Sequence, residues 1–279
     1  MSKFDVFQEV TDKIITALES GTSPWKKPWK DNGLDPFNPH NAVSGRSYNG
    51  INWLLLSLAP YASTGWLTYK QAQAIGGNVK KGEKGTMITY WQFIEKEDNT
   101  KFPMVRAFTV FNVEQCENLD ESKMKKATDI IQGETDINEI AKSIGATVRH
   151  GGNRAYYTTN GDFISIPSMQ DFIDIDNYKA TLAHELVHWT GHKSRCDRQF
   201  GNRFGDNAYA FEELVAEIGS AFIGAKLSLD FATMQHDSYI NSWLKVLKED
   251  KRAIFTAASQ AKKAVDFIFD DNDQTEEDA

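Results

Sequence analysis

The pattern of apolar positions near the start of the chain is helical. Apolar side chains recur at every third or fourth residue from Phe7 to Leu18, and Gly21 ends the run. A second apolar run over residues 54–58 predicts another helix. The chain therefore begins with helical segments separated by an irregular stretch rich in turn-forming residues.

Residues 86–113 change to the alternation of a β-hairpin. Apolar and polar residues alternate over 86–94 and again over 104–113, with a polar stretch between them. Upstream, Thr68 and Gln71 have the spacing of an N-terminal capping box, which predicts a short helix before the hairpin. This part of the chain is expected to mix helices and strands.

A polar, poorly periodic segment over residues 118–134 predicts a linker between two domains. It separates residues 1–117 from residues 135–269. The second domain is expected to begin with a helix and three short strands, followed by two longer helices. The expected strands lie near 147–149, 154–158 and 162–166, and the last of these helices runs from about Asp206 to Leu227.

Composition narrows the class of protein. A chain of 279 residues with 41% hydrophobic residues can bury two ordinary cores. Cys116 and Cys196 are far apart and outside any CxxC pattern, which excludes a disulfide framework and favours a reducing compartment. No apolar run approaches the roughly 18 residues of a membrane span, so we expect a cytoplasmic protein without membrane contact.

Charge is distributed unevenly. Residues 1–117 hold 13 basic and 12 acidic residues, whereas residues 118–279 hold 18 basic and 27 acidic residues. Six carboxylates crowd into residues 270–279, so we expect a solvated, disordered acidic tail there. The net charge of −8 makes the whole chain a poor nonspecific binder of nucleic acid, and any such binding would depend on local basic clusters.

The segment from Thr181 to His192 contains the pattern His-Glu-x-x-His. His184 and His188 are one helical turn apart, so both imidazoles can reach one divalent metal, while Glu185 lies beside them as a candidate general base for hydrolysis. Apolar neighbours and the helix-stopping Gly191 fit a buried metal-binding helix. The alternative is a surface helix with two incidental histidines.

A catalytic zinc usually has three protein ligands, so a third ligand is expected. The later helix offers Glu212, Glu213 and Glu217, and His192 is a further alternative. In gluzincins a downstream helix supplies a glutamate ligand, and an acid four residues later holds the first histidine. This resemblance implies that Glu213 is the ligand and that Glu217 orients the first histidine. Tyr209 is a candidate for stabilising the oxyanion in the catalytic site.

Two basic segments are candidates for binding single-stranded nucleic acid, because stacking rings beside lysines suit that ligand. One is the proline-stiffened stretch around the first two tryptophans, and the other is a glycine-containing basic turn before the hairpin. The alternatives are tryptophans buried under a loop and a solvated hairpin end. The candidate DNA-binding residues, including two from the loop between them, are Trp25, Lys26, Lys27, Trp29, Lys30, Arg46, Tyr48, Lys80, Lys81 and Lys84.

Several motifs together resemble the ArdC-type antirestriction proteins, whose N-terminal domain is shared with plasmid primases. They include Ser44-Gly-Arg-Ser-Tyr-Asn-Gly-Ile-Asn52, His184-Glu-Leu-Val-His188 and Phe211-Glu-Glu-Leu-Val-Ala-Glu217. The resemblance covers roughly residues 4–269. It implies an α+β protein with two domains: an N-terminal α/β single-stranded-DNA-binding domain, and a C-terminal zincin-like metallopeptidase domain.

The resemblance also implies a function. Such a protein would be carried by mobile elements and protect entering DNA from restriction, with Zn²⁺ or another divalent metal such as Mn²⁺ held by His184, His188 and Glu213. Its partners would be single-stranded DNA and an unidentified protein substrate. Two other readings stay open: a DNA-binding shield whose metal site is structural or vestigial, and a metallopeptidase with no nucleic-acid role.

Overall fold

The computed structural model describes most of the chain. Five DNA-binding candidates, from Trp25 to Lys30, lie outside the described residues, as does the acidic tail beyond residue 270. The described ranges are 4–21, 38–95, 101–131, 136–200, 207–229 and 239–270.

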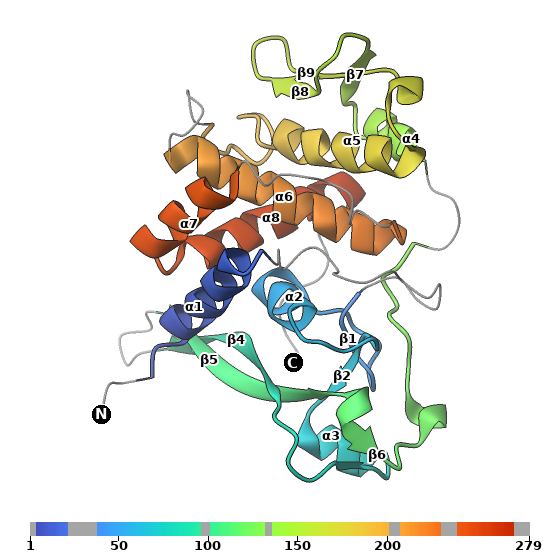
Figure 1. The fold of residues 1–279 in the computed structure, drawn as a ribbon, viewed down its shortest axis with the longest axis vertical. Coiled ribbons are helices and arrows are strands. Elements are labelled where there is room, and N and C mark those ends of the chain that lie inside the picture. The colour runs from blue at the N-terminus through green and yellow to red at the C-terminus, as the bar shows by residue number, and fades with distance from the viewer. Residues whose placement is uncertain are drawn as a thin grey trace.

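The described elements are stacked in layers (Figure 1). A small sheet lies at one end, a block of long helices follows, two helices of the N-terminal half pack beneath that block, and a larger sheet lies under them. The helices are α1 (Val6–Glu19), α2 (Gly50–Ser57), α3 (Tyr69–Ala74), α4 (Ile137–Ser143), α5 (Ile175–Thr190), α6 (Asn207–Leu227), α7 (Ile240–Glu249) and α8 (Ala253–Phe269).

The larger sheet has four strands in the order β1-β2-β5-β4. β4 and β5 pair antiparallel from Thr86↔Val110 to Glu95↔Lys101, which confirms the expected hairpin. The capping box of Thr68 and Gln71 opens α3 as expected. The strands of this half are β1 (His40–Asn41), β2 (Gly65–Leu67), β3 (Asn78–Val79), β4 (Thr86–Glu95), β5 (Lys101–Asn112) and β6 (Cys116–Glu117), of which β3 and β6 form a separate pair.

The small sheet has the order β7-β9-β8, from strands β7 (Thr147–His150), β8 (Tyr156–Thr158) and β9 (Phe163–Ile166). By analogy with zinc-peptidase folds, we expect the last strand before the metal-binding helix, near residues 162–166, to be available to hold an extended peptide. That analogy is wrong for β9, because β9 pairs with β7 on one side and β8 on the other. The edges of the small sheet are therefore β7 and β8.

One hydrophobic core joins the two halves of the chain. Buried residues of α1 and α2 belong to the same cluster as those of α5, α6 and α8. Trp53 of α2 meets Phe222 of α6 edge-on with 5.2 Å between ring centroids, and the buried Thr11 hydroxyl donates to the Lys251 carbonyl at 2.8 Å. The domain boundaries remain a prediction, but the halves do not pack as independent bodies.

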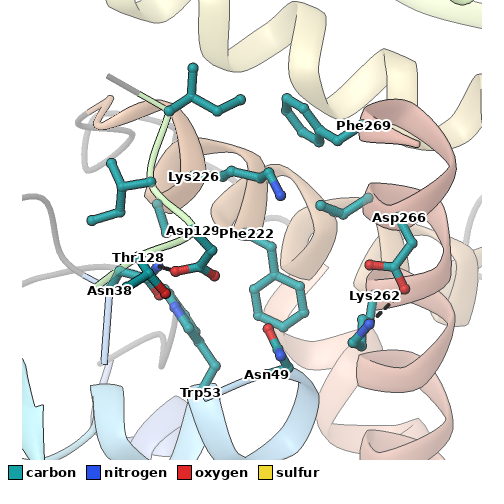
Figure 2. Close-up of a pocket in the computed structure, with 14 residues that line it drawn as sticks. Asn38, Asn49, Trp53, Thr128, Asp129, Phe222, Lys226, Lys262, Asp266 and Phe269 are labelled. Carbon is teal, nitrogen blue, oxygen red and sulfur yellow. Dashed lines mark hydrogen bonds and ion pairs between the residues drawn. The ribbon is translucent and has the colours of Figure 1, made fainter. Parts of the chain in front are cut away.

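A cavity of about 420 Å³ lies where the halves meet (Figure 2). Phe222, Lys226 and Phe269 approach it from the long helices, Trp53 approaches it from α2, and Asn49 lies just before α2. The Ile131 amide donates to the Lys226 carbonyl at 3.0 Å, and residues 128–131 run along this cavity. Among the described residues, no helix is long and apolar enough to cross a membrane.

Candidate metal centre

Helix α5 presents the His-Glu-x-x-His pattern from inside the helical block. Asp174 caps its N-terminus by accepting from the Asn177 amide, and Gly191 follows its last residue, as the sequence predicts. A Cβ on Gly191 would lie 2.6 Å from the Phe200 ring, so a larger residue at this turn would require that ring to move. His184 and His188 are both buried, although imidazoles are polar. Their burial is expected when a buried partner or a metal satisfies them.

Three side chains converge at this site. The Nε2 atoms of His184 and His188 are 3.1 Å apart. Glu213 of α6 places one carboxylate oxygen 3.5 Å from His184 Nε2 and the other 3.6 Å from His188 Nε2. One ligand atom from each of the three residues lies within 4.8 Å of the others. Two imidazoles and one carboxylate are a donor set that suits a divalent transition metal.

In this trio of His184, His188 and Glu213, neighbouring charges shift the pKa values of His184 and Glu213 in opposite directions. Burial lowers the pKa of His184, but the hydrogen bond and charge of Glu213, together with Glu185 and Glu217, outweigh burial and raise that pKa to about 9. Burial raises the pKa of Glu213, but the hydrogen bond from His184 and both imidazole charges lower it to about 2. These opposite shifts favour a protonated imidazole beside an ionised carboxylate, and a bound cation would replace that proton.

Glu212, considered above as an alternative ligand, has another position in the structure. Its Oε1 atom lies 3.1 Å from His188 Nδ1, on the side of the ring away from the other histidine. The buried Arg198 donates from Nε and Nη2 to the same carboxylate at 2.9–3.3 Å. The hydrogen bond to Glu212 fixes the proton of His188 on Nδ1 and leaves the Nε2 lone pair directed toward His184 and Glu213.

Arg198 was missed by the sequence reasoning. Its guanidinium also donates to Thr190 Oγ1 at 2.9 Å and to the Val187 carbonyl, so it fixes the turn after α5 to both helices. The available signal was an arginine shortly after the helix stop at Gly191. That signal does not identify a partner 14 residues further on.

The other expected site residues lie around the trio. Glu217 Oε2 is 3.7 Å from His184 Nδ1, and Glu185 is buried, with burial raising the pKa of its carboxyl against the opposing charges of the histidines. Tyr209 is half-buried. Its hydroxyl oxygen lies 3.2 Å from the hydroxyl oxygen of Tyr239, and the hydroxyl also hydrogen-bonds to Glu213. The roles assigned to these residues remain predictions.

The described DNA-binding candidates differ in exposure. Tyr48 is half-buried against Trp66 and its neighbours, and the Lys80 ammonium donates to the Glu114 carbonyl at 2.8 Å. Lys81, Lys84 and Arg46 are exposed. Their contacts with DNA are not tested by the structure.

Two family models match the chain. Residues 4–131 match the N-terminal domain of anti-restriction factor ArdC, and residues 135–260 match a zincin-like metallopeptidase. The crystal structure of Mn(II)-bound antirestriction ArdC protein from the R388 plasmid is 40% identical, with a TM-score of 0.81 over 97% of this chain and 100% of that chain. Its metal-free structure gives a TM-score of 0.82 over 98% of this chain and 100% of that chain.

Curated relatives extend the comparison. A DNA primase TraC of Escherichia coli is 39% identical over 94% of this chain, which spans only 27% of that primase. The uncharacterized protein y4eC of Sinorhizobium fredii (strain NBRC 101917 / NGR234) is 35% identical over 95% of this chain and 91% of its own length. The α+β fold class with a zincin-like second half is confirmed, and the chain belongs to the ArdC-type antirestriction family.

Proposed function

We propose that this protein is an antirestriction factor of a mobile genetic element that binds single-stranded DNA and hydrolyses a peptide bond at its metal centre. The observation that carries the enzymatic part is the convergence of His184, His188 and Glu213 beside the buried Glu185. The family, the Mn(II)-bound relative and the donor set support a divalent metal, and we propose Zn²⁺ as the native ion. We propose that the protein acts in the cytoplasm.

The metal-binding residues, Glu185 and Tyr209 have different roles in the proposed hydrolysis. A divalent cation held by the trio would act as a Lewis acid on a substrate carbonyl. Glu185 takes a proton from the attacking water and returns it to the leaving amine, a transfer that a buried carboxyl beside the reacting bond can make in both directions. Tyr209 donates its hydroxyl proton in a hydrogen bond to the developing oxyanion.

A comparison of Glu185→Gln with wild type tests this proposal. Glutamine keeps the size and hydrogen bonding of the side chain but removes the base, so metal content should stay near wild type while peptidase activity falls. Antirestriction activity is measured in the same cells. Full antirestriction activity of Glu185→Gln would favour the alternative of a DNA-binding shield with a structural metal.

The DNA-binding part is tested on the full chain. Affinity for a labelled oligothymidine should fall as salt rises, because lysine–phosphate contacts release counterions. Salt-insensitive binding, or none, would leave the metallopeptidase without a nucleic-acid role.

A further inference from the structure

The β4–β5 ribbon carries two aromatic rings on a face that the metal centre does not use. Phe108 is 47% exposed, and its ring meets Tyr90 edge-on with 6.0 Å between centroids. Tyr90 pairs with Arg106 across the ribbon, and Ile88 pairs with Phe108. Residues paired across strands, and residues two apart along a strand, share a face. Tyr90, Arg106 and Phe108 therefore lie together on one side of the ribbon.

The opposite face is covered by helices. The Phe7 ring of α1 lies 5.9 Å from the Trp91 ring, and the side chain of Asn52 in α2 bonds both the amide and the carbonyl of Thr89. Figure 1 shows α1 and α2 on that side, with the ribbon extending beyond the short strands β1 and β2. At Tyr90 and Phe108 this face is therefore the outer one, whereas Ile88 and Val110 on the same face are buried in a cluster with Leu56 and Trp66.

Positive charge accompanies these rings. Arg106 is exposed, and within the described ranges its guanidinium forms neither an ion pair nor a hydrogen bond. Lys81 and Lys84 are exposed in the turn that leads into β4. An exposed phenylalanine and a half-buried tyrosine beside this guanidinium are suited to a ligand with both flat rings and negative charge.

We infer that this outer face binds single-stranded DNA, with bases stacking on Phe108 and Tyr90 and with Arg106 contacting phosphate. The inference rests on the proposed DNA binding and places it on residues that the sequence motifs did not indicate. A protein partner would instead use the apolar area alone, or pair with the backbone of the edge strand β4.

Replacement of Phe108 by leucine and by tryptophan in the full chain separates stacking from apolar contact. Leucine keeps an apolar side chain but has no ring, so Phe108→Leu should weaken oligothymidine binding about 5- to 150-fold without changing the salt dependence. Phe108→Trp should bind at least as tightly as wild type. Arg106→Gln should make the slope of log affinity against log salt shallower by about 0.7.

Tyr156→Leu is the matched control. Tyr156 is 46% exposed and meets Phe163 edge-on at 6.5 Å, but it lies on β8 in the other half of the chain. Its replacement should leave oligothymidine affinity at the wild-type value. Binding is measured by fluorescence anisotropy on protein whose melting curve shows it folded.

The outcomes distinguish this inference from the broader proposal. If the wild type does not bind oligothymidine, the proposed DNA function is lost and this inference with it. If the wild type binds and Phe108→Leu binds equally well, only the placement on the ribbon is overturned. The placement is also overturned if Phe108→Leu alters self-association in light scattering while DNA affinity stays unchanged.

Discussion

Replacing Arg198 with methionine should destabilise the metal-free protein by isolating a buried charge. Arg198 is 7% exposed, and the carboxylate of Glu212 that it pairs with is 3% exposed. The substitution removes the guanidinium donors to that carboxylate, which keeps only His188 Nδ1, and it removes the bonds to Thr190 and Val187. Removing one partner of a buried ion pair costs about 3–5 kcal/mol. We expect a loss of that size in the free energy of unfolding.

The double variant Arg198→Met, Glu212→Met separates stability from metal binding. With both charges gone, most of the lost stability should return, because an apolar pair of similar volume often replaces a buried ion pair without cost. Metal affinity should fall below that of Arg198→Met, because His188 Nδ1 loses its acceptor only in the double variant. Loss of such an orienting partner typically weakens metal binding about 10- to 100-fold.

The two quantities are measured separately. Urea unfolding in the presence of a chelator gives the stability of the metal-free protein, and competition with a chelating dye gives the affinity for Zn²⁺. Arg154→Met, at an exposed position, is the control and should change neither. Wild-type metal affinity in the double variant would refute the orienting role of Glu212. Failure to recover stability would refute the buried-charge argument.

Three further changes test the packing and electrostatics of the fold. The raised pKa of His184 means that its proton stabilises the metal-free protein below pH 6.5, and that this stability is lost as pH rises through about 9. Melting temperatures measured with a chelator should therefore fall over that window, while the affinity for Zn²⁺ should rise. Flat profiles of both quantities would contradict the raised pKa of His184. Gly219→Ala would place a Cβ 2.8 Å from a Val187 methyl group, so urea unfolding should show about 1–3 kcal/mol less stability, and Val187→Ala in the same chain should relieve it. Asn52→Asp cannot donate to the Thr89 carbonyl, and thermal melts should report a loss of about 1–3 kcal/mol, whereas an unchanged melt would make that hydrogen bond unimportant.

Local chemistry made much of the fold predictable. The helix stop at Gly191 and the capping box at Thr68 depend on residues within one turn of each other, and both are present. The hairpin followed from strict alternation over residues that pair with their sequence neighbours. The spacing of His184 and His188 placed two imidazoles together for the same reason.

Features that depend on contacts between distant segments were not predictable. Arg198 reaches Glu212 only because the turn after α5 folds back onto α6, and no periodicity encodes that return. Asn52 stands in a motif rich in turn formers, yet it is helical and bonds the backbone of a strand 37 residues away. β9 is the central strand because it pairs with β7 on one side and with β8 on the other. The length of the strand alone does not indicate these two partners.

The common core has a consequence for how this unit can be exchanged between genes. The two matched family segments meet between residues 131 and 135, which looks like a natural crossover point for recombination. A crossover there would set Trp53 of one parent against Phe222 of another, in a contact that fits only if both surfaces have changed together. Productive recombination should therefore move residues 4–270 as one unit, and chimeras joined at the boundary should need compensating substitutions along α2 and α6.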